Sequence, residues 1–166
     1  MGCDIHPFIE VYNETSDKWH VLCGYERVYG DSDNFNKENG VLWDARNTNW
    51  SEYRNSSQGE LGNRNYDVFA VLADVRNRGS AIIPICDPKG KPEDVNEFVG
   101  SELSLFEADY HSTSWHTFDD LLDWWEENKI QHKQYCEEFF ETIEEIRNDL
   151  SGVPASHIRL VFAFDN

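Results

Sequence analysis

Both ends of the chain alternate apolar and polar residues, the pattern of a β-strand with two different faces. At the C-terminal end, four apolar side chains fall on one face: Ile158, Leu160, Phe162 and Phe164. At the N-terminal end, residues 4–12 alternate in the same way, with Ile5, Ile9 and Val11 on the apolar face. A third alternating stretch, 18–23, follows a turn-rich segment, so the N-terminal end is expected to form a β-hairpin.

Between the two terminal strands, the sequence shows patterns typical of helices. One helix is expected from Asn65, a plausible N-cap, to Gly79, and a short buried strand from 81 to 85. Segment 112–117 is interpreted as the capped start of a second helix, because Thr117 and Asp120 resemble a capping box, and a third helix is expected over about 133–150. The sum predicts one α+β domain over residues 1–166, in which about three helices pack on an antiparallel or mixed sheet built from both termini.

Residues 24–65 form a long stretch rich in Gly, Asn, Ser and charged residues, interrupted by tryptophans. A loop of this length inside a compact domain is often a lid or a binding loop. In that case Trp43 and Trp50 would bind substrate by stacking on a base. A surface insertion that its tryptophans fasten to the core fits the same pattern, and both interpretations stay open.

The charge of the chain is strongly negative. The sequence has 14 basic and 32 acidic residues, a formal net charge of −18. Such a surface repels nucleic-acid phosphates and anionic membranes, so broad nucleic-acid binding and membrane association are not expected. A small phosphate-bearing ligand in a local basic pocket remains compatible with this charge, and so does a basic host protein that the acidic surface would block.

The four cysteines are scattered without Cys-x-x-Cys spacing, and no apolar run approaches the length of a membrane span. We therefore expect a cytoplasmic protein with reduced thiols. Cys3 falls on the same side of its strand as Ile5, which favours a buried structural role.

Two Asp-x-His pairs are the most specific chemical signal. Asp4 and His6 share one face of the N-terminal strand, and Asp109 and His111 repeat the pair far along the chain. If they converge, their carboxylates and imidazoles would bind a divalent metal such as Zn, Mn or Fe. A strand with one solvent-facing side would carry the same residues without any metal.

Further residues would complete a hydrolytic site around such a metal. Glu10 lies on the same face as His6 and would act as a general base, while His116 would protonate a leaving group. Arg64, just before the first helix, would bind an anionic substrate where backbone N–H groups also attract anions. Arg76 was expected in the last turn of that helix, where a cation has a structural role.

The chain resembles a family of small phage and prophage proteins. The resemblance is carried by the opening Met1-Gly2-Cys3-Asp4-Ile5-His6, by segments 64–70, 73–77 and 88–92, and by Asp109-Tyr110-His111-Ser112 with Trp115. It spans most of the chain outside the long loop, and the opening hexapeptide is its most specific part. It implies a phage-encoded accessory protein of the host-cell cytoplasm and carries no activity with it.

Two functional hypotheses follow. The first is a metal-dependent hydrolase of a small phosphate ester or nucleotide. The second is a non-catalytic phage accessory protein that sequesters a host signalling nucleotide, or blocks a host protein and so antagonises host defence.

Overall fold

A computed structural model describes residues 2–22, 60–79 and 81–165. Within them, four strands form one antiparallel sheet in the order β2-β1-β4-β3. The strands are β1 (Ile5–Asn13), β2 (Lys18–Leu22), β3 (His111–Thr117) and β4 (Ile158–Phe164). Most of the long loop expected at 24–65, including Trp43 and Trp50, lies outside the described residues, so their predicted role stays a prediction.

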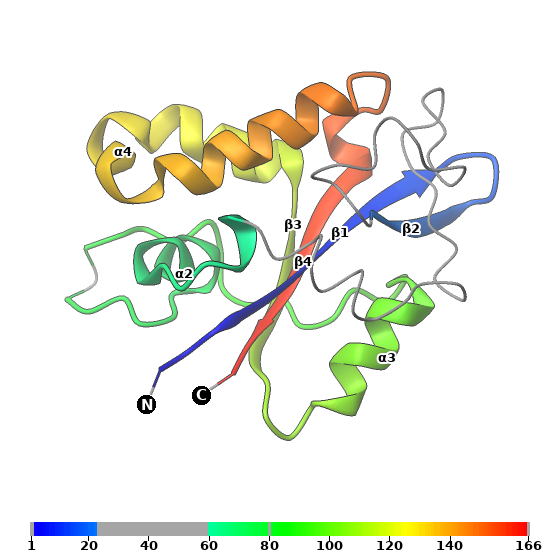
Figure 1. Ribbon diagram of the computed structural model, residues 1–166, viewed down its shortest axis with the longest axis horizontal. Coiled ribbons are helices and arrows are strands. Elements are labelled where there is room, and N and C mark those ends of the chain that lie inside the picture. Colours follow the sequence, from blue (N-terminus) through cyan, green and yellow to red (C-terminus); the bar gives the residue numbers. More distant parts are fainter. Residues whose placement is uncertain (1, 23–59, 80, 166) are drawn as a thin grey trace.

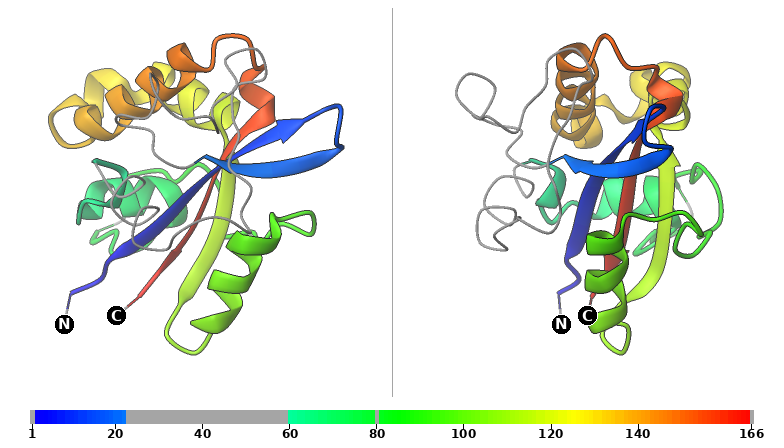
Figure 2. Two further views of the ribbon diagram at one scale, coloured as in Figure 1. Left: turned by 45° about the vertical axis from the view of Figure 1, so that its right-hand side comes forward. Right: turned by 90° about the vertical axis from the view of Figure 1, so that its right-hand side faces the viewer.

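The two terminal strands occupy the centre of the sheet. β1 pairs with β4 from Ile5↔Phe164 to Val11↔Ile158, and the backbone N–H of Asp165 donates to the carbonyl of Asp4 at 3.1 Å. The chain ends therefore lie side by side at one edge of the molecule (Figure 1; Figure 2). This arrangement confirms the predicted α+β fold with a sheet built from both termini.

The sheet has an apolar core on each face. Helices α2 (Tyr66–Ala73) and α4 (Phe118–Asp149) pack on the larger core, which includes Ile5, Ile9 and Phe162. Helix α3 (Glu97–Leu105) packs on a smaller core that includes Phe8 and Val161. Figure 1 shows α2 and α4 on one side of the strands and α3 on the other. The short 3-10 helices η2 (Glu60–Gly62) and η3 (Ala155–His157) complete the elements.

Helix α2 begins where the sequence predicts and ends earlier. The Asn65 side chain accepts hydrogen bonds from the backbone N–H groups of Asp67 and Val68, which confirms the N-cap. The helix stops at Ala73, because Asp74 adopts a left-handed conformation with φ 58°. The expected end at Gly79 is therefore wrong. The strand expected at 81–85 is also absent from the described residues there, since this segment is irregular and Ile83 is 75% exposed.

Segment 112–117 is a strand and not the start of a helix. It belongs to β3, which pairs with β4 from His111↔Phe164 to Thr117↔Arg159 and carries a bulge between His111 and Ser114. The strand was not predicted from this hydroxyl-rich sequence, because Ser and Thr are typical of helix caps. The capping box itself is confirmed: Thr117 and Asp120 exchange side-chain and backbone hydrogen bonds at the start of α4.

Helix α4 folds back on itself. The rings of Trp125 and Phe140 stack with centroids 4.6 Å apart, whereas 15 residues of straight helix span about 22 Å. Figure 1 shows the first half of α4 running outward and the second half returning toward the sheet. The two helical arms that the sequence predicts are thus present within one continuous helical segment. No helix among the described residues is long and apolar enough to cross a membrane.

Candidate functional site

The two Asp-x-His pairs reach the same end of the sheet but not the same site. Ile5 and His111 both pair with Phe164, so the start of β1 and the start of β3 flank the end of β4. Residues that lie opposite one another across strands share a face of the sheet. His111 therefore lies on the face of Ile5 and Phe164, toward α2, and its ring stacks on Phe164.

His6 lies on the opposite face. It alternates with Ile5, and its ring packs on Tyr110 with centroids 4.7 Å apart. A shift of one residue in the register of β3 would be needed to bring both imidazoles to one face. The register thus places the two imidazoles, those of His6 and His111, on opposite faces of the sheet.

Each expected metal ligand instead has a different neighbour. Arg64 donates two hydrogen bonds to the Asp4 carboxylate, both at 2.7 Å, and lowers the pKa of Asp4. The His6 imidazole hydrogen-bonds to Asp165 at 3.0 Å, and that of His111 lies 3.9 Å from the Cys3 sulfur.

Asp109 is exposed in the turn before β3. Within residues 2–22, 60–79 and 81–165, no group of three or more His, Cys, Asp or Glu side chains is placed to hold a metal ion. Metal binding therefore stays a prediction.

Glu10 belongs to a buried ion-pair network. It is fully buried, and its carboxylate accepts hydrogen bonds at 2.6 Å from the Asn96 backbone N–H and from the Arg159 guanidinium. Arg159 also binds Asp94 and lies over the Trp19 ring at 3.8 Å. Burial raises the pKa of Glu10, while Arg159 opposes the shift. This network fastens the loop before α3 to the sheet, and it leaves Glu10 without access to a substrate.

His116 is a core histidine. It is fully buried on β3, and its Nε2 hydrogen-bonds to the carbonyl of Leu72 at 2.7 Å. Burial lowers the pKa of His116 to about 4. The ring is therefore neutral at pH 7, with Nε2–H as the donor, and its buried Nδ1 has no hydrogen-bond partner among the residues that the structure describes. This placement does not support the expected role as a proton donor to a substrate.

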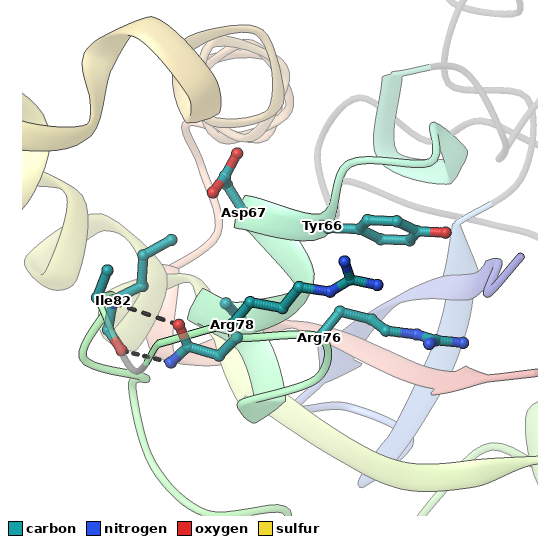
Figure 3. A pocket seen from close by; sticks show the side chains of 8 residues that line it. Tyr66, Asp67, Arg76, Arg78 and Ile82 are labelled. Carbon is teal, nitrogen blue, oxygen red and sulfur yellow. Dashed lines mark hydrogen bonds between the residues drawn. The ribbon is translucent and has the colours of Figure 1, made fainter.

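A groove beside α2, which we call the α2 groove, is lined by several polar side chains. It has a volume of about 310 Å³. Its main lining residues come from α2 and the loop that follows it: Tyr66, Asp67, Arg76, Asn77, Arg78 and Ile82. Figure 3 shows the Arg76 and Arg78 side chains extending in the same direction as the Tyr66 ring, while Asp67 points away from them.

The conformation of the loop after α2 is fixed by core contacts and by a side-chain hydrogen bond. Val75 and Ile82 are buried in the main core, and the Asn77 side-chain amide hydrogen-bonds to the carbonyl of Ile82 at 2.7 Å. Val75 therefore faces the core, while Arg76 and Arg78 are exposed and line the groove together with Asn77. Arg76 also adopts φ 58°, a left-handed conformation that costs a non-glycine residue about 1–2 kcal/mol.

The ion pairs of the described residues do not include the two groove arginines. Among the described residues, neither Arg76 nor Arg78 forms an ion pair with a carboxylate. Arg76 lies 5.9 Å from the centre of the Tyr66 ring, and its interaction with the Cys3 thiol opposes the rise in the pKa of Cys3 that burial causes. In a chain of net charge −18, two guanidinium groups that have no carboxylate partner in the described part of the chain are available to interact with an anion.

Sequence reasoning missed this groove. It assigned Arg76 to a helix end, which was wrong because the helix stops three residues earlier, and it passed over Arg78. The available signal was the Arg76-Asn77-Arg78-Gly79 run, two basic residues in a chain with few of them. Comparisons of the chain with protein-family models, with curated proteins and with solved structures found no match.

Proposed function

We propose that this protein binds a small phosphate-bearing ligand, a nucleotide in the simplest case, in the α2 groove. The observation that carries the proposal is the pair of groove guanidinium groups, Arg76 and Arg78, which have no carboxylate partner among the described residues and lie beside the Tyr66 ring. Guanidinium groups bind phosphate oxygens through paired hydrogen bonds, and their charge persists at any physiological pH.

The shape and lining of the groove fit a nucleotide. Its volume of about 310 Å³ falls at the lower end of the range for small-molecule sites, about 300–1,000 Å³. The Tyr66 ring is 38% exposed, which leaves an aromatic face open to stacking by a base. Asp67, on the far side from the arginines, offers acceptor oxygens for amino or hydroxyl groups.

Backbone strain at the groove supports the same proposal. Arg76 keeps a left-handed conformation that glycine would adopt without cost. Strained residues often persist where the side chain has a function. Here the guanidinium lies over the ring of Tyr66, which lines the groove.

The proposed action is to hold the ligand, as in the accessory-protein hypothesis, and not to hydrolyse it. The two residues expected to move protons support this choice. Glu10 is engaged by Asn96 and Arg159, and His116 is neutral and enclosed on β3. Neither residue lines the α2 groove.

Isothermal titration calorimetry with AMP, GMP, CMP, UMP and inorganic phosphate tests the proposal. We expect at least one nucleotide to bind, and Arg76→Gln and Arg78→Gln each to weaken it by about tenfold or more, since a hydrogen bond to a charged group contributes about 1.5–3 kcal/mol. Lys18→Gln is the matched control, because it removes one positive charge from an exposed position at the start of β2, away from the groove.

Two results would contradict the proposal. If neither phosphate nor any of the four nucleotides binds at millimolar concentration, the α2 groove is not an anion site. If a bound nucleotide is recovered as a cleaved product after incubation with the protein, holding is the wrong action and the hydrolase hypothesis gains support.

A further inference from the structure

The side-chain amide of Asn77 joins two ends of the loop that carries the groove arginines. Its Nδ2 donates to the Asp74 carboxylate and to the carbonyl of Ile82, both at 2.7 Å. Its Oδ1 accepts from the Ile82 backbone N–H at 3.4 Å, and the dashed lines in Figure 3 mark the two contacts with Ile82. Both amide protons and the amide oxygen are thus engaged within the loop. We call Asp74, Asn77 and Ile82 the Asn77 clasp.

The two residues that Asn77 joins are themselves anchored to the rest of the fold. The Asp74 backbone N–H donates to the carbonyl of Ala70, in the last turn of α2, at 2.9 Å. The Ile82 side chain is buried in the main core, and the Trp124 indole N–H donates to the carbonyl of the next residue, Ile83, at 3.0 Å. The clasp therefore ties the loop to two fixed points.

Both groove arginines are direct neighbours of Asn77 in the chain. Consecutive Cα atoms are about 3.8 Å apart, so a fixed Asn77 leaves the backbone of Arg76 and Arg78 little freedom. The Arg78 N–H also donates to the Arg76 carbonyl at 2.8 Å, which tightens the backbone around Asn77. All three residues line the α2 groove. The clasp thus sets the point from which each guanidinium group extends.

The clasp also engages the carboxylate that is nearest to the arginines in the sequence. Asp74 is exposed and lies two residues before Arg76, yet the ion pairs of the described residues do not include it. Its oxygen accepts from Asn77 instead. An Asp74 carboxylate that lost this hydrogen bond would be free to pair with a guanidinium group, in competition with a bound anion.

We propose that Asn77 is a positioning residue of the α2 groove, which holds Arg76 and Arg78 ready for the anion and keeps the Asp74 carboxylate away from them. This inference rests on the proposed function, because it assigns the anion to the same two arginines. Apparent affinity falls by the fraction of molecules that are not in the binding conformation. Asn77 contributes by keeping that fraction small before the ligand arrives.

Asn77→Ala tests the positioning role by calorimetric titration with inorganic phosphate, AMP, GMP, CMP and UMP. We expect the anions that bind to the unmodified protein to bind about tenfold more weakly to the variant, although both arginines remain. Asn148→Ala is the matched control, because it removes an exposed carboxamide from α4, outside the groove lining. A purely structural role of Asn77 would instead lower the melting temperature and leave the affinity unchanged.

Asp74→Asn tests the competition by the carboxylate. Asparagine tolerates the left-handed conformation of residue 74, φ 58°, and keeps an oxygen that accepts from Asn77. The single variant measures how much the loss of one negative charge tightens binding by itself. In the Asn77→Ala background the same change should tighten binding severalfold more, because the carboxylate is no longer held there.

Hydrogen exchange in the unmodified protein supplies a measurement that needs no variant. If the clasp orders the loop in advance, NMR should find the Ile82 N–H protected before any ligand is added. Phosphate should then change this protection little. An Ile82 N–H that exchanges freely and becomes protected only when phosphate binds would mean that the ligand orders the loop, and the inference would be wrong.

The outcomes separate the inference from the function on which it rests. If Arg76→Gln weakens anion binding and Asn77→Ala does not, the groove binds the anion and the positioning role is refuted. Equal effects of Asp74→Asn in the two backgrounds refute the competition. If phosphate and all four nucleotides fail to bind the unmodified protein, the proposed function fails and the inference fails with it.

Discussion

The buried imidazole of His116 makes the stability of this fold depend on pH. Its pKa is lowered from 6.5 to about 4, chiefly because burial disfavours the charged ring. The unfolded chain therefore takes up a proton at this position more readily than the folded chain does. Stability from the neutral ring is fully present above pH 6.5 and is lost as the pH falls toward 4.

The size of the effect follows from the two pKa values. The difference between 6.5 and about 4, at about 1.4 kcal/mol per pKa unit, sets an upper limit of about 3 kcal/mol on the stability lost. Between pH 7.5 and pH 5, the same linkage gives a loss of about 2 kcal/mol from this residue. The ring is fully buried, so solvent screening does not reduce this figure.

His116→Gln isolates this contribution from the many carboxylates that also titrate. Glutamine does not titrate, and its side-chain amide can still donate to the carbonyl of Leu72. We expect the free energy of unfolding of the variant to fall by about 2 kcal/mol less than that of the unmodified protein between pH 7.5 and pH 5. Urea denaturation followed by tryptophan fluorescence measures both values.

His157→Gln is the matched control for the loss of one imidazole, because His157 is partly exposed in η3 beside Glu14. If His116→Gln and the unmodified protein lose the same free energy of unfolding between pH 7.5 and pH 5, His116 is not the source of the pH dependence. It also fails if the urea m-values of the two proteins differ, because the free energies would then refer to different unfolding reactions.

Three further substitutions test the packing that positions the site. Arg159→Met should destabilise the protein by about 3–5 kcal/mol, because it leaves the Glu10 carboxylate buried without its charged partner; equal stability in urea denaturation would refute the network. Thr117→Ala should lower the free energy of unfolding by about 1 kcal/mol through loss of the capping box, and an unchanged melting curve would contradict this. Trp125→Ala should cost about 3–5 kcal/mol because it removes the stack on Phe140, whereas a cost below about 1 kcal/mol would argue against the folded-back form of α4.

The parts of the fold that depend on local pattern could be predicted from the amino-acid sequence. The alternation in 4–12 and 158–164 predicted the two central strands, since a period of two is a property of the strand itself. The helix caps at Asn65 and Thr117 could also be predicted, because each depends on hydrogen bonds within one turn of helix. The burial of Cys3 followed from the same alternation and is confirmed.

Which polar residues lie close together depends on the tertiary structure. The sequence left open whether the two Asp-x-His pairs converge. The register of β3 against β4 places His6 and His111 on opposite faces, and register depends on pairing between distant segments. The strand β3 was not predicted, because its hydroxyl-rich residues form a strand only when they pair with β4. The Arg76–Arg78 pair shows the same dependence. Its outward direction follows from Asp74 ending α2 early and from Val75 entering the core, a packing that no local pattern specifies.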